Sequence, residues 1–146
     1  MINFFNPSNL FVFFNKLSKV IETIIIPLLI ISLIFSLFLS PQDYIQGHTV
    51  RIMYVHVPSS WIALICFSSI AFLTILNFIF KIKYFKIICT SIAPIGLLFT
   101  ALAIITGSIW GKPTWGIWWV WDIRITSMLV LMLFYIIYIL NYKLIK

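Results

Sequence analysis

The segment "WGKPTWGIWWVWD", residues 110–122, carries five of the six tryptophans of this 146-residue chain. These are Trp110, Trp115, Trp118, Trp119 and Trp121, and they are followed directly by Asp122. Indole rings are flat and apolar and carry a single N–H donor, so a cluster of them is suited to stacking against a large planar ligand. Tryptophans also form belts at membrane interfaces, but a belt normally marks both interfaces.

His56, in "RIMYVHVPSSW", is the candidate metal ligand. Imidazole is a common axial ligand of haem iron, aromatic rings can stack on a porphyrin, and Arg or Lys can pair with the propionates. A lone interfacial histidine is more often an amphipathic side chain at the water boundary, but the tryptophan cluster favours a ligand role here. His48 has no such context. Arg124 is the candidate partner for an acidic edge, with snorkelling to lipid headgroups as its structural alternative.

Asp122 directly precedes an apolar run, where it is expected to cap the N–H groups of a helix and to help hold the shape of the loop. Gly111, Pro113 and Gly116 are expected to break any regular helix or strand through the tryptophan segment, because Gly admits positive φ and Pro lacks an N–H. We therefore expect a shaped, tryptophan-rich loop over residues 107–122.

The elements that must position these groups are four apolar runs, over residues 20–39, 58–80, 87–106 and 123–142. The chain is 63% hydrophobic and 9% charged, unlike soluble domains. About 20 helical residues span the ~30 Å hydrocarbon layer. We predict an all-α integral membrane protein with four transmembrane helices in a single domain, 1–146. The formal charge of +7 comes from Lys and Arg at the ends of the runs, as topology signals do, so a nucleic-acid partner is excluded.

The lysines also predict the orientation. They precede the first run, join the second to the third and follow the fourth, as Lys16, Lys19, Lys81, Lys83, Lys86, Lys143 and Lys146. The positive-inside rule then places both termini in the cytoplasm and the two loops that carry His56 and the tryptophans on the outer side. Residues 3–14, rich in Phe but interrupted by Asn and Pro, are expected to lie in the interface. Cys66 and Cys89 lie at different depths, so no disulfide is expected.

The segments "TGSIWGKPTWGIWWVWDIRITSMLVL" and "RIMYVHVPSSW" resemble the haem exporter protein C family, which carries the tryptophan-rich WWD signature of cytochrome c maturation. The resemblance runs from about Ile21 to Tyr142. It implies a protein that holds haem at the outer face of the bacterial inner membrane, or of the mitochondrial one, and passes it to a haem chaperone with ATP-binding cassette transporter subunits as partners. By the same resemblance His56 is an axial haem ligand, and the WWD tryptophans and Asp122 belong to the haem site.

The chain departs from the family pattern in one respect. Family members usually have six spans and a second axial histidine in a third outer loop, whereas this sequence ends after the fourth run. His48 is a poor substitute, because it shares a short loop with His56 and axial ligands approach opposite faces of the ring. A fragment, half of a split gene and a naturally shortened product all stay open, as does a separate chain that supplies the missing spans.

The leading interpretation is therefore haem binding and delivery without enzymatic activity, since the chain has no acid/base pair, thiolate spacing or phosphate loop. Two alternatives stand beside it. The tryptophans could form a docking surface in a membrane complex, because exposed aromatic residues are also interface hot spots, or the chain could be an inactive remnant of the haem-handling protein.

Overall fold

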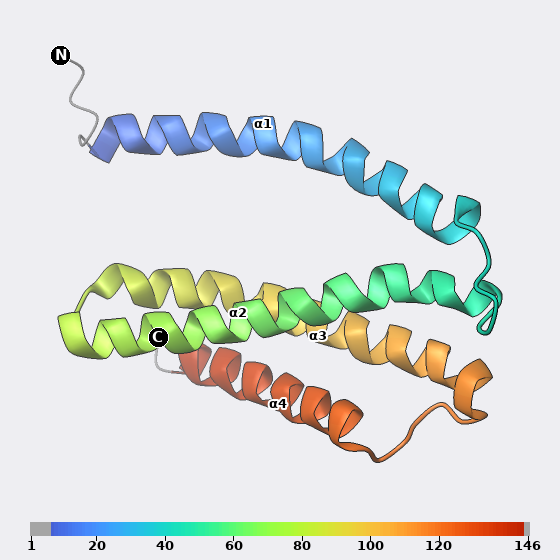
Figure 1. Cartoon of the computed structure of the whole chain (residues 1–146). Coiled ribbons are helices and arrows are strands. Elements are labelled where there is room, and N and C mark those ends of the chain that lie inside the picture. The colour runs from blue at the N-terminus through green and yellow to red at the C-terminus, as the bar shows by residue number, and fades with distance from the viewer. Residues whose placement is uncertain (1–6, 145–146) are drawn as a thin grey trace. The chain divides into compact units, whose positions relative to one another are not determined.

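The computed structural model describes residues 7–144, and within that range the chain is helical with no strand (Figure 1). The elements are α1 (Pro7–Ile34), a short π-helix η1 (Phe35–Leu39), a 3-10 helix η2 (His48–Ile52), α2 (Met53–Phe80), α3 (Lys83–Trp115) and α4 (Ile123–Leu144). Among the described residues, four helical segments are long and apolar enough to cross a membrane. The predicted all-α fold with four candidate spans is therefore confirmed.

The described residues belong to two compact units, Met1–Ser40 and Pro41–Lys146. In the first unit, residues 7–14 form the beginning of α1, and residues 3–6 lie outside the described range; the interfacial position of residues 3–14 stays a prediction. The helix runs through Pro27 and bends along its second half (Figure 1). The bend is expected there, because proline removes one helical hydrogen bond.

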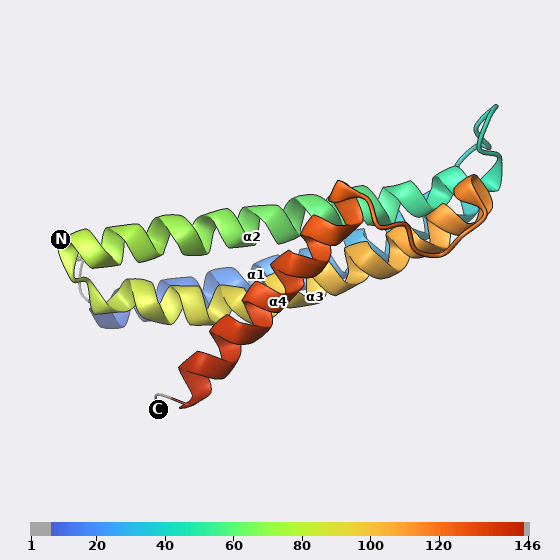
Figure 2. The ribbon, with the colours of Figure 1, turned by 90° about the horizontal axis from the view of Figure 1, so that it is seen from below.

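In the second unit, α2 and α3 run antiparallel side by side and α4 crosses them (Figure 2). The turn between α2 and α3 lies at the end of the bundle opposite to the loops 41–47 and 116–122 (Figure 1). Lys86 places its Nζ 5.8 Å from the centre of the Tyr142 ring, so the start of α3 meets the end of α4. The two loops that carry the candidate site thus share one end of the unit.

The core of this unit contains small residues on α2 and α3 beside Ile70 on α2, and Leu131 and the ring of Tyr135 on α4. Ala63 and Ala93 are fully buried, and the hydroxyl of buried Tyr135 donates to the carbonyl of Ala63 at 2.7 Å. A Cβ on Gly96 would lie 2.3 Å from the Tyr135 ring. Gly96 therefore allows a close helix approach, since the ring occupies the space that a side chain would need.

Two helices extend beyond their expected limits. α2 begins at Met53, five residues before Pro58, so Pro58 is inside the helix and not in its first turn. α3 continues through Gly111 and Pro113 to Trp115, so the expectation that these residues break the helix is wrong. Only residues 116–122 of the expected loop are non-helical. Pro113 lies in the last turn, where the helix loses one hydrogen bond shortly before it ends at Gly116, whose φ is 79°.

Candidate functional site

A cavity of about 330 Å³ lies between α2, α3 and α4, towards the end of the unit that carries the two loops. It is bounded by residues of all three helices, namely His56, Ser60, Leu64, Ala103, Ile104, Gly107, Trp110, Trp115, Arg124, Ile125, Ser127 and Met128. Four of the residues singled out from the sequence, His56, Trp110, Trp115 and Arg124, therefore meet around one space. Its volume falls within the range of small-molecule sites.

His56 belongs to the first turn of α2, and α3 holds its ring. Its Nδ1 lies 3.0 Å from the carbonyl oxygen of Ala103 and 3.2 Å from Oγ1 of Thr106. The Thr106 hydroxyl donates to the carbonyl of Leu102 at 2.6 Å, so its oxygen is available as an acceptor. Because a carbonyl only accepts, Nδ1 must donate, and a neutral ring then carries its lone pair on Nε2. This is the arrangement that protein ligands of metals commonly have.

Gly107 gives the His56 ring its room. A Cβ at this position would lie 3.0 Å from Cε1 and 3.4 Å from Nδ1 of the imidazole. A larger residue would therefore require the ring to shift. The position of the His56 ring on α2 therefore depends on the absence of a side chain at Gly107 on α3.

Trp110 and Trp115 form an aromatic wall on α3. Their ring centroids are 4.9 Å apart and the planes meet at 83°, an edge-to-face pair. The indole Nε1 of Trp110 donates to Oε1 of Gln46 at 3.1 Å, and this bond connects the loop 41–47 to the wall. Gly111, four residues before Trp115, leaves room for the Trp115 ring, because a Cβ there would lie 3.3 Å from Cε3 of that indole.

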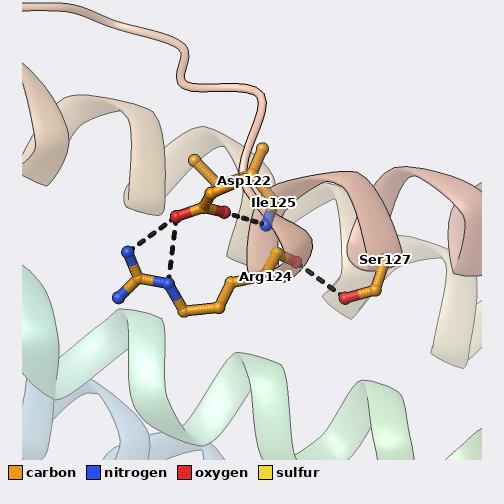
Figure 3. A network of polar contacts seen from close by, with 4 residues as sticks. All are labelled: Asp122, Arg124, Ile125 and Ser127. Atoms are coloured by element: carbon orange, nitrogen blue, oxygen red, sulfur yellow. Dashed lines mark hydrogen bonds and ion pairs between the residues drawn. The ribbon is translucent and has the colours of Figure 1, made fainter.

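Asp122 and Arg124 form an ion pair at the start of α4 (Figure 3). Oδ1 of Asp122 accepts from the backbone N–H of Ile125 at 2.9 Å, so the predicted helix cap is confirmed. Oδ2 accepts from Nε and Nη2 of Arg124 at 3.0 and 2.6 Å. The bond from Ile125, followed by those from Arg124, holds the pKa of Asp122 below its ordinary value.

The guanidinium of Arg124 also lies 5.2 Å from the centre of the Trp115 ring. Arginine has five N–H donors, and Asp122 engages two of them. The side chain is 74% exposed. Arg124 can therefore donate to an anionic group at the cavity while keeping its contacts with Asp122 and Trp115.

The other three tryptophans lie in the loop 116–122 and do not line the cavity. Trp119 and Trp121 form an edge-to-face pair at 5.4 Å, while Trp118 and Trp121 are 58% and 76% exposed. The Nε1 of Trp119 is buried and has no hydrogen-bond partner within residues 7–144. The five clustered tryptophans thus divide into a cavity pair on α3 and a group of three in the loop, of which Trp118 and Trp121 are exposed.

Other polar residues considered from the sequence lie elsewhere. His48 hydrogen-bonds through Nε2 with Gln42 and does not line the cavity. Lys112 donates to the carbonyl of Gly116 at 2.8 Å at the end of α3, where a cation favours the helix dipole. The sequence reasoning missed Gln46, Thr106, Gly107 and Met128. The only signal for Thr106, Gly107 and Met128 was their spacing along α3 and α4, and the only signal for Gln46 was a polar side chain in a short loop.

Comparisons with known proteins identify the family. The family model described as "Heme exporter protein C" matches residues 1–146. The chain belongs to the haem exporter protein C family. It is 40% identical over 121 residues to heme exporter protein C of Haemophilus influenzae and 43% identical over 97 residues to that of Escherichia coli K12. It is also 42% identical over 101 residues to a ccmC-like mitochondrial protein of Marchantia polymorpha, whose name assigns it to cytochrome c biosynthesis.

These alignments cover 83%, 66% and 69% of this chain but only 49%, 40% and 44% of the relatives, in the same order. The chain thus spans about half or less of the length of these members of the haem exporter protein C family. The family name describes an exporter and not an enzyme, which agrees with the expected non-enzymatic role. Relatives occur in bacteria and in a mitochondrion, and with four candidate spans the chain is a membrane protein.

Proposed function

We propose that this chain binds haem in the cavity between α2, α3 and α4, with Nε2 of His56 as an axial ligand of the iron. The observation that carries the proposal is the contact between Nδ1 of His56 and the carbonyl of Ala103, because it leaves the Nε2 lone pair for a metal. Trp110 and Trp115 would contact the edge or face of the porphyrin. Arg124 would donate to a propionate.

The donor set suits a metal carried inside a macrocycle. Within residues 7–144 no group of three or more His, Cys, Asp or Glu side chains could hold a bare ion. A porphyrin supplies four nitrogen donors to its iron, so one imidazole from the protein is sufficient to anchor it. The lining supplies both kinds of contact that such a ligand needs, aromatic rings for its plane and N–H donors for its carboxylates.

The test is an absorption titration of the purified protein with haemin in detergent. We expect a Soret band that His56→Ala abolishes or shifts strongly. His48→Ala is the matched control, because His48 is a histidine of the same region that does not line the cavity. An equal response of both variants, or a band unchanged in His56→Ala, would overturn the assignment of the ligand.

The wider role that we propose is haem delivery for c-type cytochrome biogenesis at the outer face of a bacterial inner membrane. A haem chaperone and ATP-binding cassette transporter subunits are the proposed partners. Family membership and the lysine pattern support this role. Reporter fusions after Ile82 and after Gly116 should report cytoplasm and the outer side, respectively; the reverse would reject the orientation.

A docking role is the second candidate, and the exposure of Trp118 and Trp121 favours it for the loop 116–122. Exposed tryptophans are frequent interface hot spots. If the loop docks a partner, Trp118→Ala with Trp121→Ala should abolish co-purification of that partner and leave the haem spectrum intact. Loss of the haem spectrum in this double variant would assign the loop to the haem site.

A further inference from the structure

The loop 41–47 has a backbone fixed by several hydrogen bonds. One of its side chains contacts the cavity wall. Oδ1 of Asp43 accepts from the backbone N–H groups of Ile45 and Gln46 at 2.9 and 2.8 Å. Asp43 and Gly47 exchange two backbone hydrogen bonds at 2.9 and 3.1 Å. The carbonyl of Gln46 accepts from both N–H and Oγ1 of Thr49 at 3.2 and 2.5 Å. The N–H and the C=O of Gln46 are both engaged, so its backbone has little freedom.

From this fixed backbone the side chain of Gln46 reaches α3. Its Oε1 accepts from Nε1 of Trp110 at 3.1 Å, across 64 residues of sequence. Indole has one N–H donor, so this bond defines the rotation of the ring about its side-chain axis. Without it, the ring would keep its place on the helix but could turn relative to the cavity.

The orientation of Trp110 is passed on to other cavity residues. Trp110 meets Trp115 edge-on at 4.9 Å, and Trp115 in turn lies under the guanidinium of Arg124 at 5.2 Å. All three residues line the cavity, whereas Gln46 does not. A rotated Trp110 would therefore disturb both the wall and the cation that the wall supports.

We infer that Gln46 is a positioning residue, which fixes the Trp110 ring against the cavity through the bond between Oε1 and Nε1. The effect on ligand binding rests on the proposed haem site, whereas the effect on the ring does not. The loop 41–47 then connects the start of α2, next to η2, with the end of α3 that carries Trp110. Its contribution to binding is preorganisation of the wall and not contact with the ligand.

The experiment compares Gln46→Leu, which removes the acceptor, with Gln46→Glu, which keeps one. The haem-free readout is the indole N–H spectrum of the ¹⁵N-tryptophan-labelled protein, in which Trp110→Phe identifies the Trp110 signal. We expect Gln46→Leu to shift this signal and speed its exchange with water, and Gln46→Glu to keep it hydrogen-bonded. A Trp110 signal that does not respond to Gln46→Leu would overturn the inference.

The haem-dependent readout is a double-mutant cycle. Gln46→Leu should weaken haem binding about 2- to 12-fold, the range for one neutral hydrogen bond, and should have no further effect in Trp110→Phe. Equal weakening in both backgrounds would overturn the inference, because Gln46 would then act independently of Trp110. If the protein binds no haem but the Trp110 signal still responds, the positioning role stands and the proposed function fails.

Discussion

The Nδ1 atom of His56 lies 3.0 Å from the carbonyl oxygen of Ala103, so a residue of α3 orients the candidate ligand on α2. The contact joins residues 47 positions apart and exists only because the two helices pack closely at this level. Substitutions on α3 should therefore alter the coordination chemistry of His56 although His56 itself is not replaced.

Gly107→Ala should displace the His56 ring while leaving the fold intact. The added Cβ would lie 3.0 Å from Cε1, so the ring must move by a few tenths of an ångström. We expect haem affinity to fall by about 10-fold, since changes in the groups that orient a metal ligand commonly cost that much, together with a shifted Soret band. Ile105→Ala is the control on the same helix, because Ile105 is exposed and does not line the cavity. An unshifted Soret band in Gly107→Ala would contradict the expected displacement.

Gly96→Ala should destabilise the second unit. Its Cβ would lie 2.3 Å from Cζ and Oη of Tyr135, which donates to Ala63 and is almost fully buried. Overpacking of this kind costs about 1–3 kcal/mol, measurable as a lower midpoint of thermal unfolding in detergent. Tyr135→Leu combined with Gly96→Ala should recover part of the loss, because the ring tip is gone. Strictly additive losses would show that the two residues do not compete for this space.

The cap of α4 should make stability depend on pH. Asp122 has a depressed pKa in the folded protein, so its carboxylate contributes stability above its ordinary pKa of 3.8, and that contribution is lost as pH falls through the lower folded pKa. Asp122→Asn keeps an acceptor for Ile125 but loses the ion pair with Arg124. We expect wild type to unfold at a higher temperature than Asp122→Asn at pH 7, and the two curves to converge as pH falls through the lowered pKa of Asp122 in the folded protein. A difference that is independent of pH would argue against the ion pair.

The two tryptophans of the cavity wall should affect haem retention more strongly than the tryptophans of the loop 116–122. Trp110→Ala and Trp115→Ala each remove part of the cavity wall, and each aromatic contact contributes roughly 0.5–1.5 kcal/mol beyond burial. We expect each single change to weaken haem retention a few-fold and the double change to weaken it more, as measured by haem transfer to apomyoglobin. Trp118→Ala with Trp121→Ala should have a smaller effect, because these rings do not line the cavity. The opposite order would place the haem on the loop.

The number and type of the helices could be predicted from the sequence, because about 20 apolar residues leave few alternatives to a spanning helix. The start of α4 was also predictable, since Asp122 is a cap with the required oxygen. The limits of α2 and α3 were not. Pro58 and Pro113 each remove only one hydrogen bond, and the helices continue through both. Proline alone therefore did not locate the helix ends in this chain.

These displaced limits explain what the sequence could not reveal about the site. Even with His56 and Trp110 placed on their helices, the contacts of His56 with Ala103 and Gly107 depend on the register between α2 and α3. No local pattern encodes that register. The bond between Gln46 and Trp110 is likewise a tertiary contact, and the sequence offered only a polar residue in a short loop.

The central claim is that Nε2 of His56 binds the iron of haem, and chemical rescue tests it most directly. His56→Gly removes the imidazole and leaves a space beside Gly107 and Ala103 that free imidazole can enter. We predict that His56→Gly binds haemin poorly and that added imidazole restores a Soret band close to that of wild type, whereas His48→Gly needs no rescue. Wild-type haem binding by His56→Gly without imidazole would contradict the claim.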